Sequence, residues 1–372
     1  MKSNSKVFFC KNCVAMSTRP RISFDENGIC NACTWSKKKL KYNWEKPLSL
    51  IKNYIKKEIK NKKAPYDCVV PVSGGKDGSY VYHQVKNKLK LNPLAVTVNP
   101  ALPQKLGIEN LNNFSNSGPC LISINPPYET MRKLNFFGFK YAGFPYYGWL
   151  IAIHTAVIRI ASQFNIKLIF YGEDGELEYG GSTLTKDKIF YNTDYMKKVY
   201  LENKINNILN KKSFNKSDLF FFTFPESNFL KKIKFTHYSY FENWDPYRNY
   251  LVAKKLYGLR ENVETNAGTF SNFAQNDQKL YALHTYLMYL KFGFGRCNQD
   301  SAIEIRRGAM KRQQAIELIK LYDNQYPQMY LDDYLNYFQI SKKKFDSIID
   351  KWVNKKLFYK VKNYWQPKFE IE

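Results

Sequence analysis

Four cysteines near the start of the chain have the spacing of a metal site. Cys10 and Cys13 form one CxxC pair and Cys30 and Cys33 form another, with 16 residues between the pairs. Each CxxC turn can direct two sulfurs at one ion, and four thiolates complete the tetrahedron that Zn²⁺ prefers, leaving no position for water. The spacing therefore predicts a structural zinc site. A redox pair or an iron–sulfur cluster is the alternative.

A glycine-rich turn predicts a phosphate site. Residues 73–79 read SGGKDGS, after an apolar run at 68–72 and before a potential helix at 80–89. Backbone N–H groups of such a turn and the N-terminus of the next helix can converge on an anion. The turn lacks the GxxxxGK[ST] spacing of a Walker loop. The alternative is a turn that only joins strand to helix.

An acidic cluster follows the predicted strand at 167–171. Its carboxylates belong to Glu173, Asp174, Glu176 and Glu178, and they are unusual in so basic a chain. At the carboxyl end of a strand they could bind Mg²⁺, orient a substrate or accept a proton. A solvated acidic loop is the alternative.

The elements that must position these residues alternate along the chain. Apolar runs at 68–72, 94–98, 121–124 and 167–171 predict strands, and helical patterns lie at 80–89, 104–116 and 148–164. This alternation predicts an α/β fold with a parallel, doubly wound sheet. Ligands of such sheets bind at the carboxyl ends of the strands.

The ends of the chain differ from its middle. Residues 47–62 are typical of a basic amphipathic helix. Beyond residue 275 one helical stripe of leucines occurs, and Ser341 is placed to cap a further helix. We therefore expect a zinc knuckle at 1–45, a nucleotide-binding domain at 46–270 and a mainly helical subdomain at 271–372.

Composition limits the location and partners of the protein. The formal charge is +26, from 58 basic and 32 acidic residues. Because Lys is scattered along the chain, we interpret this charge as a solvated surface, with binding of RNA or acidic metabolites as the alternative. The most apolar stretch, 149–161, contains His154 and Arg159, so a membrane span is not expected. Paired cysteines without a signal-like segment favour a cytoplasmic protein.

The turn at 73–79 resembles the PP-loop of the N-type ATP pyrophosphatases, which holds the β- and γ-phosphates of ATP. Here Gly78 stands at the usual serine position and Ser79 follows it. The resemblance implies that Lys76 neutralises phosphate charge, that Asp77 helps to hold Mg²⁺, and that Val98 and Asn99 face the adenine. The implied nucleotide-binding residues are Ser73, Gly74, Gly75, Lys76, Asp77, Gly78, Ser79, Val98, Asn99 and Gly172.

Several blocks together resemble the N-acetyl sugar amidotransferase family, which includes enzymes of pseudaminic acid and O-antigen (lipopolysaccharide) sugar biosynthesis. These blocks are FDENGICNAC at 24–33, the turn at 73–79, YGED at 171–174 with EYG at 178–180, YFENWDP at 240–246, and FGFGR at 292–296 with EIRRG at 304–308. The resemblance implies a PP-loop fold and an ATP-dependent enzyme that converts an acetamido group of a bacterial surface sugar into an acetamidino group. AMP and pyrophosphate would be its products, and a glycosylated surface such as flagellin or lipopolysaccharide would be the destination of the sugar.

The implied cofactors are ATP, Mg²⁺ and Zn²⁺. The chain has no GxCxG nucleophile segment, so the family resemblance implies a separate glutaminase subunit, with or without a cyclase-like partner, as the source of ammonia. In this chemistry Lys76, Asp77, Glu173, Asp174 and Glu178 are the candidate catalytic residues.

The substrate-binding candidates lie in the last third of the chain. Arg306 and Arg307 could pair with a sugar carboxylate or a diphosphate, and a surface salt bridge is the alternative. His284 lies beside the leucine stripe, which favours a hydrogen-bonded core histidine over a catalytic base.

Two other functions compete. Some tRNA-thiolating enzymes also join a cysteine knuckle to a PP-loop, but they use further cysteines, and here Cys68, Cys120 and Cys297 are isolated. A non-catalytic, nucleotide-binding scaffold would bind nucleotide without forming pyrophosphate.

Overall fold

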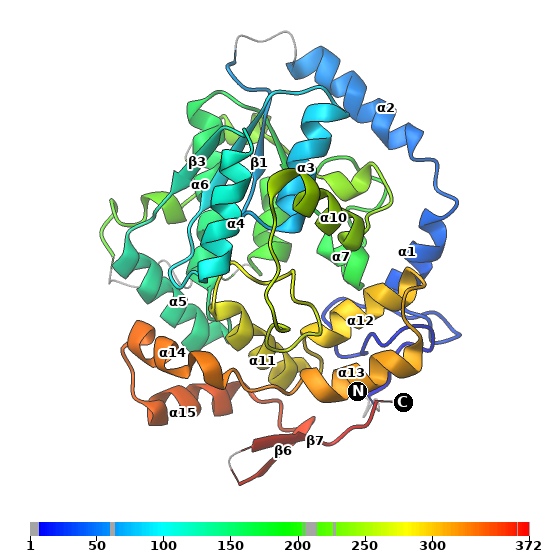
Figure 1. The fold of residues 1–372 in the computed structure, drawn as a ribbon, viewed down its shortest axis with the longest axis vertical. Coiled ribbons are helices and arrows are strands. Elements are labelled where there is room, and N and C mark those ends of the chain that lie inside the picture. The colour runs from blue at the N-terminus through cyan, green and yellow to red at the C-terminus, as the bar shows by residue number, and fades with distance from the viewer. Residues whose placement is uncertain are drawn as a thin grey trace.

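A five-stranded parallel sheet forms the centre of the molecule (Figure 1). The structure is a computed structural model that describes residues 7–59, 64–202, 204, 214–225, 228–362 and 364–371. The strand order is β3-β2-β1-β4-β5, and each neighbouring pair is parallel. The predicted parallel sheet is confirmed. Its strands are β1 Cys68–Pro71, β2 Pro93–Val98, β3 Leu121–Ile124, β4 Leu168–Tyr171 and β5 Lys234–His237.

The order of the strands creates a crevice between β1 and β4. From β1 to β3 the chain crosses the sheet in one direction, and it then returns to form β4 and β5 on the other side of β1. Because such crossovers are right-handed, the helices of the two halves cover opposite faces. All six residues of β2 are buried, as expected of a strand covered on both faces. Ligands of doubly wound sheets bind where the direction reverses, which here is the carboxyl ends of β1 and β4.

The helix after β1 begins earlier than predicted. The sequence indicates a helix from residue 80, but α3 starts at Lys76, because Gly75 is already extended in the N-cap position. Lys76 and Asp77 therefore lie in its first turn. The helices around the sheet are α3 Lys76–Asn87, α4 Lys105–Asn116, α5 Tyr128–Ala142, α6 Tyr147–Gln163, α7 Gly175–Tyr179, α8 Thr193–Tyr195 and α10 Pro246–Tyr257.

Five of these elements have no counterpart in the sequence-based prediction: α5, α7, α8, α10 and β5. Asp245 caps α10 by accepting hydrogen bonds from the N–H groups of Tyr247 and Arg248, and Pro246 occupies its first turn. This local signal is strong. The four residues of β5 carry no such signal, because so short a strand shows no clear period.

The chain after α10 forms the lower half of the molecule in Figure 1. The predicted leucine stripe is confirmed, since Leu280, Leu283, Leu287 and Leu290 are all fully buried. Ser341 accepts a hydrogen bond from the N–H of Lys344 and so caps α15 as expected. The helices here are α11 Leu280–Phe292, α12 Arg296–Arg306, α13 Arg312–Tyr322, α14 Leu331–Phe338 and α15 Lys342–Trp352.

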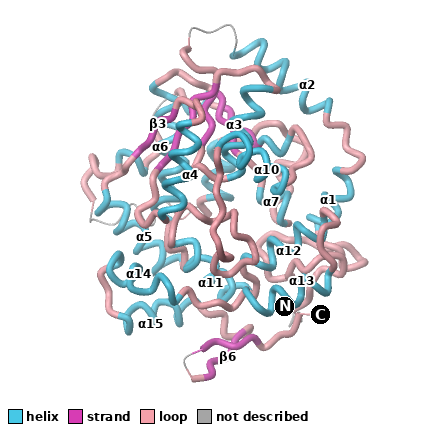
Figure 2. The backbone as a smooth tube through the Cα atoms, viewed as in Figure 1, coloured by secondary structure: helices cyan, strands magenta, loops and turns pink. Residues whose placement is uncertain are grey.

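An antiparallel hairpin near the C-terminus was not predicted. It pairs β6 Phe358–Val361 with β7 Tyr364–Pro367. Figure 2 shows it at the opposite end of the molecule from the parallel sheet, with helices and loops between them. The alternation of buried and exposed residues that marks a strand is weak here, because β6 buries only Phe358 and β7 buries only Trp365.

The N-terminal segment carries α1 Asn31–Lys39 and α2 Glu45–Tyr54. The helix predicted at 47–62 thus begins at Glu45, and it continues as a π-helical turn at Ile55–Ile59. Residues 60–62 of that prediction lie outside the described residues. Further short turns of helix are Met196–Tyr200, Phe220–Phe222, Leu230–Lys232, Tyr238–Tyr240 and Gln328–Tyr330.

Across the described ranges, no helix has both the length and the apolar character that crossing a membrane requires.

The loop between β1 and α3 depends on glycine at one position, and this gives a first prediction. Gly74 has φ +79°, and a Cβ atom there would lie 2.4 Å from the backbone nitrogen of Leu111 in α4. We expect Gly74→Ala to lower the free energy of unfolding by roughly 2 kcal/mol or more, measured by urea denaturation.

Gly75→Ala is the matched control for Gly74→Ala. Gly75 has φ −77°, and the nearest atom to an added Cβ is the Ser73 hydroxyl at 3.3 Å. Its cost should stay below about 1 kcal/mol. Equal losses for the two variants would contradict the close approach of the loop to α4.

Candidate functional site

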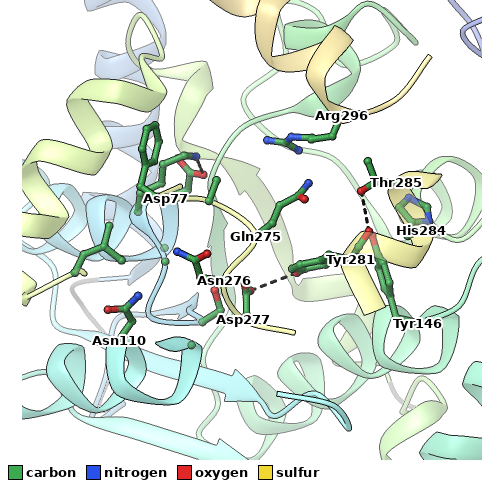
Figure 3. Close-up of a pocket in the computed structure, with 18 of the residues that line it drawn as sticks. Asp77, Asn110, Tyr146, Gln275, Asn276, Asp277, Tyr281, His284, Thr285 and Arg296 are labelled. Atoms are coloured by element: carbon green, nitrogen blue, oxygen red, sulfur yellow. Dashed lines mark hydrogen bonds and ion pairs between the residues drawn. The ribbon is translucent and has the colours of Figure 1, made fainter. Parts of the chain in front are cut away.

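A cavity of about 410 Å³ opens at the carboxyl ends of β1 and β4. Four parts of the chain enclose most of it: the turn at 73–78, α4, the loop that leads into α11, and one face of α11 with the start of α12 (Figure 3). The loop before α11 is held by amide hydrogen bonds, in which Asn262 donates to Asn266 (2.7 Å) and to Asn276 (2.9 Å). The lining residues are Ser73, Gly75, Lys76, Asp77, Gly78, Gly107, Asn110, Tyr146, Glu173, Leu259, Phe273, Ala274, Gln275, Asn276, Asp277, Tyr281, His284, Thr285, Met288, Arg296 and Gln299.

The predicted phosphate turn lies at this cavity. Ser73, Gly75, Lys76, Asp77 and Gly78 line it, and the N-terminus of α3 begins there. The first N–H groups of a helix have no partner within the helix and carry partial positive charge, so they favour an anion. The turn is therefore able to hold a phosphate.

Ser79 does not replace the serine that Gly78 displaces from the expected pattern. Its side chain is fully buried and is absent from the cavity lining, whereas Gly78 lines the cavity. An added Cβ at Gly78 would lie 3.1 Å from the carbonyl oxygen of Pro71 and from Cα of Val72. Close packing of α3 on β1 thus explains glycine at this position.

Lys76 and Asp77 form an ion pair at the start of α3. Asp77 Oδ1 also accepts a hydrogen bond from Asn249 Nδ2 of α10, at 3.0 Å. Burial alone would lower the pKa of Lys76, but the carboxylates of Asp77 and Glu173 raise it above its ordinary value. The ammonium group therefore stays charged beside the phosphate turn.

Glu173 is the member of the acidic cluster that reaches the cavity. Its carboxylate accepts hydrogen bonds from the Tyr179 hydroxyl (2.9 Å) and from Trp244 Nε1 (3.0 Å). Burial and the nearby Asp77 carboxylate raise the pKa of Glu173, while Lys76 and other cations oppose the rise. A carboxylate with a raised pKa is a better proton acceptor near neutral pH.

Asp174, a candidate catalytic residue, has structural contacts. It is fully buried and caps α7, accepting a hydrogen bond from the N–H of Glu176 at 3.0 Å. The hydroxyls of Thr185 and Tyr240 donate to its other oxygen at 2.6 and 2.7 Å. With this many donors its carboxylate is satisfied by protein groups.

Glu176 and Glu178 turn toward the N-terminal segment. Glu176 binds Arg21, with N···O distances of 2.8 and 2.6 Å. Glu178 accepts from Lys39 Nζ at 2.7 Å and from Trp35 Nε1 at 3.2 Å. Neither residue lines the cavity. The cluster that looks uniform in the sequence is thus divided between the cavity and the knuckle.

Three residues predicted to contact the nucleotide do not line the cavity: Val98, Asn99 and Gly172. The carbonyl oxygen of Val98 accepts a hydrogen bond from Trp149 Nε1 at 2.8 Å. Asn99 Nδ2 donates to Ser123 and Asn125 at the end of β3. Gly172 packs behind Asp77, since a Cβ there would lie 3.4 Å from Asp77 Cβ.

Arg306 and Arg307 lie outside the cavity lining. Arg306 donates to the carbonyl oxygen of Glu178 at 2.8 Å and to Cys13 Sγ at 3.5 Å, so it joins the knuckle to the loop after β4. Arg307 pairs with Glu304 at 2.6 Å on the surface. Arg307 thus makes the surface salt bridge that was the alternative to substrate binding. Arg306 instead holds the knuckle against the loop after β4.

Arg296 is a cavity residue that sequence reasoning left without a role. It opens α12 and pairs with Asp300 at 2.8 Å. Burial would lower its pKa, but Asp300, Tyr179 and Glu173 raise it. A sequence signal for this position exists in the FGFGR block, because its second glycine, Gly295, leaves room for the Asp323 carboxylate. That carboxylate accepts a hydrogen bond from the Gly295 N–H at 2.8 Å and so anchors the start of α12.

Asp277, Tyr281 and the α11 face were also missed. Asp277 is half-buried, its pKa is raised by burial, and the Tyr281 hydroxyl lies 3.3 Å from its carboxylate. No short motif marks these residues. The positions 281, 284, 285 and 288 follow helical spacing, but only the packing of α11 shows that they face a cavity.

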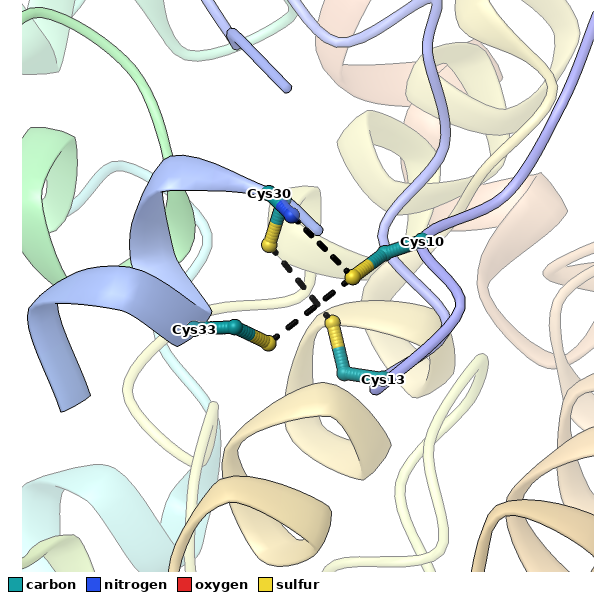
Figure 4. A group of neighbouring side chains, drawn as sticks. All are labelled: Cys10, Cys13, Cys30 and Cys33. Carbon is teal, nitrogen blue, oxygen red and sulfur yellow. Dashed lines mark hydrogen bonds between the residues drawn. The ribbon is translucent and has the colours of Figure 1, made fainter. Parts of the chain in front are cut away.

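The four knuckle cysteines meet as predicted (Figure 4). All are buried, and their sulfurs lie within 4.8 Å of one another. The Sγ atoms of Cys10 and Cys33 are 3.8 Å apart, as are those of Cys13 and Cys30. Four sulfurs at about 2.3 Å from a tetrahedral Zn²⁺ would be about 3.8 Å apart. The arrangement therefore fits a metal ion such as zinc.

Backbone and side-chain donors surround these sulfurs. The N–H of Cys30 donates to Cys10 Sγ at 3.2 Å, and Asn12 Nδ2 donates to Cys33 Sγ at 3.2 Å. Together with Arg306 they offset the negative charge of four thiolates.

We predict one Zn²⁺ per chain, measured by elemental analysis of the purified protein. Cys13→Ser should lose the metal and lower the melting temperature by several degrees, because binding of the ion stabilises only the folded state. Cys120→Ser, at an exposed cysteine outside the cluster, is the control and should retain both. Stoichiometric iron, or a metal-free protein of unchanged stability, would refute the zinc assignment.

Two comparisons relate the chain to known proteins. Residues 267–370 match the sequence model of the family described as "LPS biosynthesis protein WbpG-like, C-terminal domain". This part carries α11 and α12, and so one side of the cavity. A stretch of 183 residues is 30% identical to an uncharacterized protein of Methanocaldococcus jannaschii, covering 48% of this chain and 63% of that protein. The chain thus matches less than two thirds of the length of that relative. The family match relates the C-terminal part of the chain to proteins of lipopolysaccharide biosynthesis.

Proposed function

We propose that the protein is an ATP-dependent amidotransferase that converts an acetamido group of a surface sugar into an acetamidino group. The observation that carries the proposal is the convergence of Lys76, Asp77, Glu173 and Arg296 on one cavity at the N-terminus of α3. The match of the C-terminal part to a lipopolysaccharide biosynthesis family supports a sugar as the acceptor. The turn at 73–79 supports a PP-loop fold, to which we assign the sheet.

The chemistry requires an activated amide, because an amide carbon is a poor electrophile. In the proposed reaction the amide oxygen forms a bond to the α-phosphorus of ATP, and the bond to the leaving pyrophosphate breaks. Ammonia then bonds to the carbon of the adenylated imidate, and AMP leaves with the former amide oxygen. The nitrogen that came from ammonia gives up one proton as AMP leaves.

Each charged cavity residue has a place in this sequence. The α3 N-terminus and Lys76 hold the β- and γ-phosphates, and Arg296 stabilises negative charge that develops on the leaving pyrophosphate. Glu173, with its raised pKa, accepts the proton released during the attack of ammonia. The loop before α11 covers the turn and excludes water that would hydrolyse the intermediate.

The cavity also suits a magnesium ion bound together with the nucleotide. Among the described residues, the four knuckle cysteines are the group in which three or more side chains could hold a metal ion. Mg²⁺ needs fewer, because it is held by one or two carboxylates with phosphate oxygens and water. Asp77, in the cavity, would hold the ion, which neutralises triphosphate charge when bound.

The source of ammonia is proposed to be a partner glutaminase, with or without a cyclase-like subunit. None of the described cysteines lines the cavity: Cys68 and Cys297 are fully buried, and Cys120 is exposed elsewhere. The same absence of a cavity thiol disfavours tRNA thiolation. Free ammonium is the alternative ammonia donor.

Product analysis tests the proposed function. With ATP, Mg²⁺, ammonium and a panel of acetamido sugars, we expect AMP and pyrophosphate, and a sugar product that is lighter and more basic, detected by mass spectrometry. ADP as the stoichiometric product would refute adenylation of the amide. Nucleotide binding without any turnover would instead favour the non-catalytic, nucleotide-binding scaffold.

Asp77→Asn tests the role of the carboxylate in the phosphate turn. We expect product formation to fall roughly 100-fold or more, the scale of losing one preorganised charge-stabilising group. The amide keeps the shape of the side chain, so the melting temperature and the zinc content should stay near those of the wild type.

Asp346→Asn is the matched control, because Asp346 pairs with Lys342 on the exposed side of α15. It should turn over at the wild-type rate. If Asp77→Asn also kept that rate, Asp77 would be only a charge at a helix N-terminus, which contributes up to about 1 kcal/mol to stability.

A further inference from the structure

α11 presents two different faces. Its leucine stripe packs into the core around Phe139, Tyr334 and Phe345. The opposite face, at positions 281, 284, 285 and 288, lines the cavity and consists of Tyr281, His284, Thr285 and Met288. Tyr146, from the residue before α6, completes this wall, which we name the α11 wall (Figure 3).

His284 is half-buried and has an unusual environment for a histidine. Its ring packs against the rings of Phe144 and Tyr146, with centroids 4.4 and 4.9 Å away, and those two rings also contact each other. Its Nδ1 atom is buried, and no described protein atom hydrogen-bonds to it. At Nδ1, the sequence-based expectation of a hydrogen-bonded core histidine is therefore not met. A buried polar atom without a partner costs about 1–3 kcal/mol, which points to a role other than stability.

The charge of the α11 wall is neutral. Burial, with a smaller effect of Lys291, lowers the pKa of His284 to about 3, so the imidazole is uncharged at cellular pH. The cavity cations are already paired, Arg296 with Asp300 and Lys76 with Asp77. Aromatic rings with a few neutral hydrogen-bonding groups suit a sugar and its amide better than a phosphate.

The two sides of the cavity suggest which ligand lies where. Figure 3 shows Asn110 of α4 and His284 of α11 on opposite sides of Gln275, Asn276 and Asp277. α4 follows β2, the strand whose end the PP-loop resemblance assigns to the adenine, and its residues Gly107 and Asn110 line the cavity. We therefore assign the nucleotide to the α4 side. With the phosphates at the turn between them, the α11 side remains for the acceptor.

We propose that the α11 wall is the subsite for the acetamido sugar, with His284 as its hydrogen-bonding specificity residue and the rings of Tyr146 and Tyr281 against the sugar. The inference rests on the proposed function, because that function supplies the sugar. It adds to it the place of the acceptor and the residues that select it.

Ligand-observed NMR tests the subsite separately from catalysis. The probes are N-acetylneuraminic acid and UDP-N-acetylglucosamine, and saturation transfer to the N-acetyl methyl group is read with wild type, His284→Ala and Met288→Trp. Affinity for ATP is measured in parallel by fluorescence titration. His83→Ala is the matched control, since His83 lies on α3 with its ring against Tyr257, outside the cavity lining.

We expect methyl saturation in the wild type and in His83→Ala, and a loss of sugar affinity of at least tenfold in both α11 variants. Affinity for ATP should stay within about twofold, because the nucleotide lies on the α4 side. Met288→Trp fills the wall without removing the imidazole, so the same loss in both variants, at an unchanged melting temperature, excludes a folding defect. A variant that melts early is replaced by His284→Asn and read in the same way.

Other outcomes overturn the inference. If neither sugar binds the wild type, or if the α11 variants bind sugar as the wild type does, the wall is not the acceptor subsite. If His284→Ala loses ATP instead, the wall holds the nucleotide. Failure of the wild type to bind ATP would refute the proposed function but would leave the sugar-binding comparison readable.

Discussion

The adjacency of β1 and β4 is the constraint on which the cavity depends. The strand order puts the carboxyl ends of these two parallel strands side by side, although they are far apart in the sequence. Asp77 follows one strand and Glu173 follows the other, so both line the same cavity. The carboxylates of Asp77 and Glu173 raise the pKa of Lys76 although burial lowers it. Burial and the Asp77 carboxylate raise the pKa of Glu173 against the opposing effect of Lys76.

The N-terminal knuckle stabilises one side of this arrangement. Its residues bind the segment from 176 to 181 at several points: Arg21 holds Glu176, Lys39 holds Glu178, and Arg19 Nε donates to the carbonyl oxygen of Gly180 at 2.7 Å. Arg306 adds a link from α12. The loop that contains Glu173 is therefore held in place by the N-terminal knuckle, which lies outside the cavity. A rigid support of this kind is what a preorganised site requires.

The C-terminal helices complete the cavity and give it two chemical characters. α12 contributes the cation Arg296, whose helix is anchored by a buried carboxylate, Asp323, with its pKa raised to about 7 by burial. α11 contributes aromatic and neutral groups, among them His284. One side of the cavity is thus suited to phosphate and the other to an uncharged polar ligand. Both helices belong to the part of the chain that matches a lipopolysaccharide biosynthesis family.

The sequence by itself determined the features that short spacings encode. The two CxxC pairs, the glycine turn after an apolar strand, the alternation of strands and helices, the leucine stripe and the Ser341 cap all depend on neighbours within a few residues, and all are found in the structure. The tertiary structure alone decided which of four clustered carboxylates enters the cavity, because that depends on where the knuckle docks. It also decided that Arg306 joins the knuckle and that His284 faces a cavity. Such facts follow from strand order and helix packing between distant segments, and no local pattern of residues carries that information.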